Sequence, residues 1–219
     1  LRNAGYDLKM SDVLNSSRLK EMTAKLRLLS RIIDQEPVEG EVILSPIQCA
    51  FLENAFAKGS DQEKQLFHQS FMFCFPGGIS NTEAKVIVEK LMSHHDALRL
   101  RFEKSRDGKW SQYNAGLSQV DFIIEESTIP HDMALNVTAI AKFFEDQGSR
   151  LKMKLGFVNA PLLGVGLYHN AETKESHFLM SVHHLVIDLV SWRILFEDIE
   201  TLLTQFRNGS ELKLPDKTD

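Results

Sequence analysis

Cysteine is scarce in this sequence, with two residues in 219, Cys49 and Cys74. They form no CxxC pair and no zinc-finger spacing, and the histidines supply no HExxH motif. The sequence therefore predicts neither a disulfide framework nor a metal site. We expect both cysteines to be small buried side chains in a reducing compartment, which favours a cytoplasmic protein.

Positive charge is also in short supply. Lysine and arginine number 25 against 30 acidic residues, which gives a formal net charge of -5. The sequence lacks the basic surface that binds a polyanion, so nucleic acid is excluded as the main partner. It also lacks an apolar run of the roughly 18 residues that a membrane span needs, and no signal peptide opens it. The first residue, Leu1, and the polar ending LKLPDKTD lead us to expect that both ends are cuts in a longer polypeptide.

The sequence pattern changes near residue 40. Residues 1–29 predict a small helical unit with a short helix near Ser11–Asn15 and a longer one after it, capped by Ser17. Residues 30–40 are acidic and rich in helix breakers, and they predict a linker. Residues 41–219 alternate helical and strand patterns, which predicts an α/β sandwich in which helices cover a sheet.

Capping boxes mark two helix starts in this larger part. Ser45 pairs with Gln48, and Ser80 pairs with Glu83. Alternation of apolar residues indicates strands, and helical periodicity indicates further helices. The strands are expected at 67–75, 97–102, 120–126, 162–170 and 176–184, and the last two helices at 132–153 and from about Ser191.

The segment HHLVIDLVSW, residues 183–192, places two histidines and an aspartate in an apolar run. Side chains alternate along a strand, so His183 and His184 are expected to point to opposite faces. The pair therefore makes no bidentate metal site. One imidazole, that of His184, can face a cavity and act as a general acid or base near neutral pH, while the other packs inside. The alternative that both are core histidines stays open.

Asp188 falls where this strand turns into the last helix. A buried carboxylate at such a turn needs a cation or several donors, and Arg99 and Arg101 are the candidate partners. We expect a structural ion pair that fixes the loop carrying the imidazole, rather than a catalytic carboxylate. Ser191 is expected to cap the helix rather than to act as a nucleophile.

Four segments, in this order, resemble one enzyme family. HHLVIDLVSWRILFEDIETL is similar to the HHxxxDG segment of nonribosomal peptide synthetase condensation-type domains, and its SWRIL continuation, with Ser191 and Trp192, resembles the epimerization branch. LSPIQCAFLE, HHDALRLRF and NAPLLGVGLY resemble three other family segments. The resemblance covers about residues 41–206. Residues 1–29 resemble the last two helices of a peptidyl carrier domain.

The resemblance implies a chloramphenicol-acetyltransferase-like fold of two similar halves with a tunnel between them. This chain would be the N-terminal half, residues 41–219, preceded by the carrier tail. The substrate would be an aminoacyl or peptidyl thioester, delivered on the 4'-phosphopantetheine arm of a carrier domain, with no cofactor bound directly. The implied partners are that carrier domain, the missing C-terminal half and neighbouring synthetase modules. Antibiotic or other secondary metabolite biosynthesis is the implied context.

The resemblance also implies roles for single residues. His184 would remove and return the α-proton, interconverting L and D residues, while His183 and Asp188 would be structural and Asp188 would pair with Arg99. Leu189 stands where the family has glycine, and we expect it to narrow the tunnel mouth or shift the turn. Two alternatives follow: a condensation domain that forms peptide bonds, and a degenerate domain that only docks carrier proteins. The isolated fragment is expected to be inactive.

Overall fold

The computed structural model describes residues 6–28, 34–53 and 60–217. The chain divides into two compact units, one of Leu1–Glu36 with Asp216–Asp219 and the other of Pro37–Pro215. None of the helices among the described residues combines the length and apolarity needed to cross a bilayer.

The smaller unit has less helix than the sequence predicts. It contains β1 (Tyr6–Asp7), α1 (Met10–Leu14), α2 (Leu19–Thr23) and β2 (Arg27–Leu28), with β1 and β2 antiparallel. The expectation of a longer second helix capped by Ser17 is wrong: α2 ends at Thr23, and its cap, Arg18, makes no side-chain capping bond. An apolar stripe of Leu19, Met22, Leu26 and Leu29 recurs here at helical spacing, but Leu19 is 79% exposed, so the stripe contributes little burial to extend so short a helix. Leu29, the last position of that stripe, lies outside the described residues.

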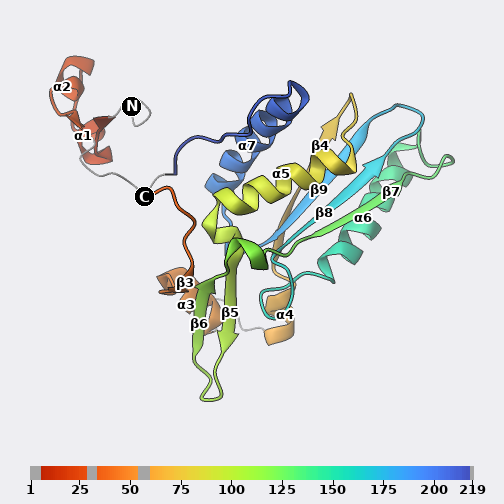
Figure 1. The fold of residues 1–219 in the computed structure, drawn as a ribbon, viewed down its shortest axis with the longest axis horizontal. Coiled ribbons are helices and arrows are strands. Elements are labelled where there is room, and N and C mark those ends of the chain that lie inside the picture. The colour runs from red at the N-terminus through yellow and green to blue at the C-terminus, as the bar shows by residue number, and fades with distance from the viewer. Residues whose placement is uncertain (1–5, 29–33, 54–59, 218–219) are drawn as a thin grey trace. The chain divides into compact units, whose positions relative to one another are not determined.

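The larger unit is a mixed α/β fold, as the sequence predicts (Figure 1). A four-stranded sheet runs in the order β4-β9-β8-β7, with β7 and β8 parallel and the other neighbours antiparallel. A second, antiparallel sheet has the order β3-β6-β5. The elements are β3 (Gly40–Val42), α3 (Pro46–Leu52), α4 (Asp61–Gln65), β4 (His68–Phe75), α5 (Asn81–His94), η2 (Asp96–Arg99), β5 (Leu100–Lys104), β6 (Trp110–Asn114), η3 (Leu117–Gln119), β7 (Ile123–Thr128), α6 (Val137–Lys152), β8 (Leu163–His169), β9 (Ser176–His183) and α7 (Leu189–Arg207).

Several boundaries differ from the predicted ones. Both capping boxes are present, at the starts of α3 and α5. The strand expected at 97–102 begins only at Leu100, because the preceding residues form the 3-10 turn η2. The expected linker ends early, since Gly40 already pairs with Asn114 in the second sheet.

Alternation along β9 divides the core between the two faces of the four-stranded sheet. Phe178, Met180 and Val182 pack with α5 and α7 on one face. Leu179 points the other way and packs with Leu151 of α6. Figure 1 shows α5 and α7 on one side of this sheet and α6 on the other. Helices thus pack on both faces of the sheet, and this packing fixes the position of the end of β9 and of the residues that follow it.

Candidate active site

A cavity of about 880 Å³ opens beside the end of β9. Its walls come from α3, from the end of α4 and from the loop that joins β9 to α7. Apolar side chains make up most of the lining, and His184 contributes an imidazole to it. The lining residues are Ile47, Gln48, Phe51, Glu63, Lys64, Phe67, Ala97, Leu100, His184, Leu185, Val186, Ile187, Asp188 and Ser191.

The two histidines lie in different environments, as strand alternation predicts. His183 is fully buried, and its ring donates from Nε2 to the Lys64 carbonyl oxygen at 2.8 Å. Its Nδ1 accepts from the Leu185 backbone N–H at 3.2 Å. Burial lowers the pKa of His183 to about 3. His183 is therefore a neutral, doubly hydrogen-bonded core residue that ties α4 to the loop after β9.

His184 lines the cavity and is half-buried. Its backbone N–H donates to the Phe67 carbonyl oxygen at 2.8 Å, and its ring stacks on the Phe67 ring with centroids 4.9 Å apart. Its Nδ1 lies 2.8 Å from the Ile187 carbonyl oxygen, and its Nε2 lies 2.9 Å from the side-chain nitrogen of Gln69. The ring is thus held by hydrogen bonds at both of its nitrogens, and it forms part of the cavity wall.

Gln69 is a site residue that the sequence reasoning missed. It lies on the face of β4 that also carries Phe71 and Phe73. The indole Nε1–H of the fully buried Trp192 donates to its Oε1 at 2.8 Å. The signal was present in the sequence, because Gln69 is the polar side chain on a strand face that otherwise carries phenylalanines. A polar residue in that position needs a hydrogen-bonding partner.

Gln48 makes long-range hydrogen bonds that the sequence reasoning also missed. Its side chain closes the predicted capping box and also donates to the Leu185 carbonyl oxygen at 3.1 Å, while its oxygen accepts from Gln112 at 3.1 Å. One amide therefore joins the start of α3 to the loop carrying His184. Local sequence reveals the capping box but gives no sign of the long-range bond.

Asp188, and not Ser191, caps the last helix. Asp188 is exposed rather than buried, and it is the N-cap of α7. Its Oδ1 accepts from the Ser191 backbone N–H at 2.8 Å and from the Ser191 hydroxyl at 2.7 Å. These bonds lower the pKa of Asp188. The prediction that Ser191 caps the helix is therefore wrong, because the helix begins two residues earlier, at Leu189.

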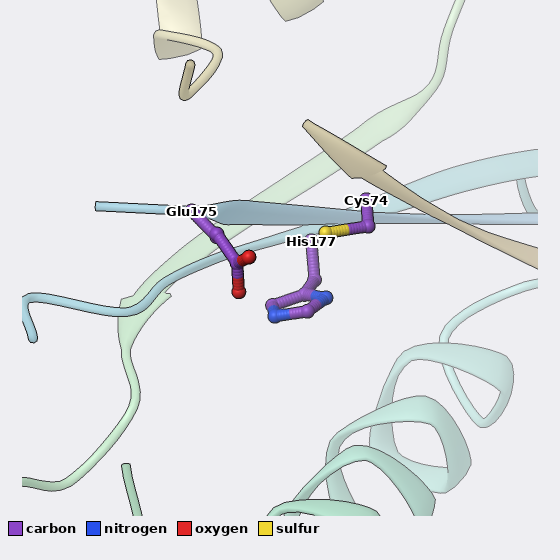
Figure 2. Close-up of side chains that lie close together, drawn as sticks. All are labelled: Cys74, Glu175 and His177. Atoms are coloured by element: carbon purple, nitrogen blue, oxygen red, sulfur yellow. The ribbon is translucent and has the colours of Figure 1, made fainter. Parts of the chain in front are cut away.

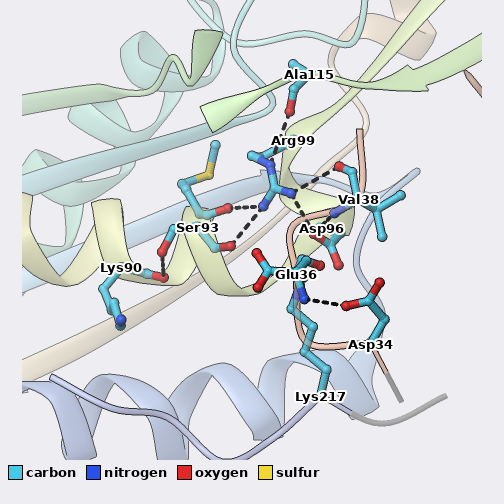
Figure 3. Close-up of polar contacts among 10 residues, drawn as sticks. Asp34, Glu36, Val38, Lys90, Ser93, Asp96, Arg99, Ala115 and Lys217 are labelled. Carbon is cyan, nitrogen blue, oxygen red and sulfur yellow. Dashed lines mark hydrogen bonds and ion pairs between the residues drawn. The ribbon is translucent and has the colours of Figure 1, made fainter. Parts of the chain in front are cut away.

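The predicted ion pair between Asp188 and Arg99 is also wrong. Arg99 is fully buried, and Figure 3 shows its guanidinium among backbone carbonyls and Asp96. Its nearest carboxylate is Oδ1 of Asp96, at 2.5 Å from Nη2. Arg101 pairs with Asp121 instead. The error arose from treating Arg99 as part of a strand with an exposed polar face, whereas it closes η2. The carbonyl oxygens that Arg99 binds belong to Val38, Met92, Ser93 and Ala115.

Leu189 is the first residue of α7 and is 75% exposed. Its backbone is helical, which any side chain tolerates, and its side chain is absent from the cavity lining among the described residues. Leu189 therefore does not narrow the part of the cavity that the described residues form, and its effect on the mouth of a tunnel between two halves stays a prediction.

Cys74, Glu175 and His177 form the cluster of donor atoms shown in Figure 2. Cys74 and His177 are directly opposite each other on β4 and β9, and their ligand atoms and that of Glu175 lie within 4.8 Å of one another. Partial burial and the nearby Glu175 raise the pKa of the Cys74 thiol, and burial lowers that of His177. Zinc accepts such donors but holds them at about 2.0–2.3 Å, and a fourth ligand is needed. We assign no metal here. Cys74 is exposed and Cys49 half-buried, so the expectation that both are buried is wrong.

Comparison with known proteins agrees with this geometry. The condensation domain family model matches residues 38–219. The chain belongs to the condensation domain family. Curated relatives include surfactin synthase subunit 1 of Bacillus subtilis (strain 168), 34% identical over 100% of this chain and 6% of the relative. Gramicidin S synthase 1 of Brevibacillus brevis is 32% identical over 98% of this chain and 18% of the relative. These relatives are nonribosomal peptide synthetase subunits, of which the chain spans a small part.

Solved structures show the same fold. The epimerization domain from the third module of tyrocidine synthetase B has a TM-score of 0.73 and 31% identity, over 85% of this chain and 40% of that one. The starter condensation domain of rhizomide synthetase has a TM-score of 0.63 and 16% identity, over 81% of this chain and 41% of that one. The second likeness, at that identity, shows the fold alone.

Proposed function

We propose that this condensation-family chain is part of an epimerization domain, which removes and returns the α-proton of a carrier-bound aminoacyl or peptidyl thioester. The single observation that carries the proposal is the placement of His184. Its imidazole lines a largely apolar cavity of about 880 Å³. The greater identity to a solved epimerization domain, 31% against 16% for a condensation domain, favours this branch of the family.

The chemistry follows from the cavity and the ring. The α-proton of a thioester is acidic enough for an imidazole to remove it when the developing enolate is stabilised. Apolar walls exclude water and so strengthen every charge interaction inside the cavity. In this proposal His184 is the catalytic base and conjugate acid, while His183 and Asp188 hold the loop that presents it.

The remaining parts of the reaction belong to other segments of the proposed synthetase. The cavity is large enough for an acyl group at the tip of a 4'-phosphopantetheine arm, which would be delivered by a carrier domain and not bound as a resident cofactor. The solved relatives are more than twice as long as the part that this chain matches. We therefore propose that the opposite wall of the site lies in a C-terminal half. From the sequence resemblance, we also propose that residues 1–29 are the tail of a carrier domain.

Condensation is the second candidate, because the matching family model and the rhizomide synthetase starter domain both carry the name condensation domain. In that reaction the same cavity would hold two acyl groups, and His184 would assist the attacking amine. The two candidates differ in one measurable respect. Epimerization exchanges the α-proton with solvent, and condensation does not.

The test uses the intact synthetase subunit, with an α-deuterated aminoacyl group on its carrier domain. We expect deuterium loss and a mixture of D and L thioester, and we expect His184→Ala to slow the loss by at least about 100-fold. His131→Ala is the matched control, because His131 is an exposed histidine whose ring binds Glu172 at 2.8 Å and lies outside the cavity lining.

Unchanged deuterium loss in His184→Ala would show that another group removes the proton. Peptide-bond formation that depends on His184, in a subunit that never exchanges the α-proton, would establish condensation instead.

A further inference from the structure

Three side chains and one carbonyl form a continuous line of hydrogen bonds through the site. The Trp192 Nε1–H lies 2.8 Å from Gln69 Oε1, and Gln69 Nε2 lies 2.9 Å from His184 Nε2. His184 Nδ1 then lies 2.8 Å from the Ile187 carbonyl oxygen. The line crosses from α7 to β4 and back to the loop before α7.

Both ends of this line have a fixed direction. An indole N–H can only donate and a backbone carbonyl can only accept. Trp192 therefore requires the oxygen of the Gln69 amide on its side, which leaves the NH₂ group facing His184. Ile187 requires a proton on Nδ1 of His184. The Nε2 atom, which receives the Gln69 N–H, must then carry the lone pair.

The line is rigid at its origin. Trp192 is fully buried, and its ring packs on Phe71 and Phe196 at 4.8 and 5.9 Å between centroids. The indole cannot turn away without opening the core between α7 and the sheet. A flipped Gln69 amide would set its NH₂ group against the indole N–H and leave two donors facing each other. The orientation of the amide is thus set by the packing of Trp192.

We propose that Gln69 and Trp192 are positioning residues that hold His184 as a neutral imidazole with its lone pair on Nε2, and that the Gln69 amide covers this atom until a substrate displaces it. The first part concerns the protonation state of the ring and stands by itself. The second part rests on the proposed function, because it takes Nε2 as the atom that receives the α-proton.

The cover follows from the same geometry. An Nε2 atom that accepts from Gln69 has no second lone pair in the ring plane for a C–H proton. Once Nε2 takes a proton, it becomes a donor and faces another donor, so the amide has to remain displaced until the proton is returned. Three charged side chains, Glu63, Lys64 and Asp188, line the same cavity as His184. His183, the preceding residue, is the titratable group next to it in the chain.

The first test is NMR spectroscopy of the 219-residue chain, labelled with nitrogen-15 in histidine and glutamine. At pH 7 we expect the Nδ1–H tautomer of His184 and a scalar coupling through the hydrogen bond between Gln69 Nε2 and His184 Nε2. Gln69→Leu should abolish the coupling but keep the tautomer, because Ile187 still accepts from Nδ1. Gln69→Glu replaces the donor by an acceptor and should place protons on both nitrogens.

Trp192→Phe removes the indole N–H and leaves most of the ring packing. We expect it to free the amide to turn, to weaken the coupling and to raise the fraction of His184 with a proton on Nε2. Gln119→Glu is the matched control: Gln119 is exposed on η3 and outside the cavity lining, so the same substitution should leave the His184 signals unchanged. A wild-type ring with its proton on Nε2, or a Gln69→Glu ring without one, overturns the proposal.

The second test is α-deuterium loss in the intact subunit. Gln69→Glu and Gln69→Leu both remove the amide, and only the former supplies an acceptor for the Nε2 proton. We expect Gln69→Glu to lose deuterium at least about ten times more slowly than Gln69→Leu. Equal rates overturn the role of Gln69 in catalysis. If the subunit never exchanges the α-proton but the His184 ring has the predicted protonation states, the positioning role of Gln69 is supported and the epimerase function is contradicted.

Discussion

The Asp188 carboxylate accepts both the backbone N–H and the hydroxyl of Ser191 and thereby caps α7. Asp188→Ala should reduce the free energy of unfolding by about 0.5–2 kcal/mol, because the first turn loses its acceptor. Asp188→Asn keeps an acceptor oxygen and should be close to wild type at neutral pH. Urea denaturation of the three chains measures the difference, and equal losses in both variants would contradict the capping role.

The same pair predicts an acid-sensitive helix start. Hydrogen bonds from Ser191 lower the folded-state pKa of Asp188 below its ordinary value of 3.8. Its contribution to stability is therefore present above about pH 3.8 and is lost as the pH falls through the lower folded-state pKa. In Asp188→Asn this part of the pH dependence should vanish, which a comparison of urea midpoints at pH 3 and pH 6 detects.

His183 predicts a second, larger pH effect. Its folded-state pKa of about 3 lies below the ordinary 6.5, so the unfolded chain binds an extra proton between these values. The stability that depends on a neutral His183 is complete above about pH 6.5 and falls by about 1.4 kcal/mol per pH unit below it. His183→Gln can still donate to the Lys64 carbonyl oxygen but does not titrate. We expect a shallower loss of unfolding free energy between pH 7 and pH 5 in that variant, and an unchanged slope would show that His183 is not the source.

Arg99 is predicted to be among the most sensitive positions of the fold. Its buried guanidinium binds Asp96 and the carbonyls at the C-terminal end of α5. Arg99→Met leaves these acceptors and the Asp96 charge without their cation and should cost about 3–5 kcal/mol. Arg106→Met, at an exposed position in the turn between β5 and β6, is the control and should stay within about 0.5 kcal/mol. Thermal unfolding by circular dichroism compares them.

Leu189→Gly tests the motif position where leucine replaces the family glycine. The side chain is 75% exposed, starts a helix and lies outside the cavity lining. Glycine should therefore lower the unfolding free energy by no more than about 1 kcal/mol and leave α-deuterium loss unchanged. A large gain in exchange rate would show that leucine does obstruct the substrate.

The sequence predicted the features that depend on local pattern. The Ser45 and Ser80 capping boxes and the separation of the two histidines follow from spacing and alternation, and the structure contains them. The strand expected at 176–184 is also present and ends one residue earlier, at His183. The errors concern long-range partners. Arg99 and Asp188 carry opposite charges, but each satisfies its hydrogen bonds within a few residues or on nearby carbonyls, and no sequence pattern distinguishes those partners from distant ones.

Gln69 also has hydrogen-bond partners that the sequence could not predict. Its position on β4 is plain in the sequence, but its two partners, Trp192 and His184, come within reach only when β4 lies beside β9 and α7 packs on the sheet. The side chains on the cavity wall were therefore partly predictable, whereas the bonds that set their chemical state required the tertiary structure.

The register between β4 and β9 determines which side chain lies next to His184. Val182 stands opposite Gln69, and His183 opposite His68. No hairpin turn joins these strands, so side-chain packing alone fixes their alignment. A slip of two residues would preserve every inward and outward direction, yet it would bring Phe67 or Phe71 to the place of Gln69. Such a sheet would still be folded and well packed, but the imidazole at its end would have lost the neighbour that sets its protons.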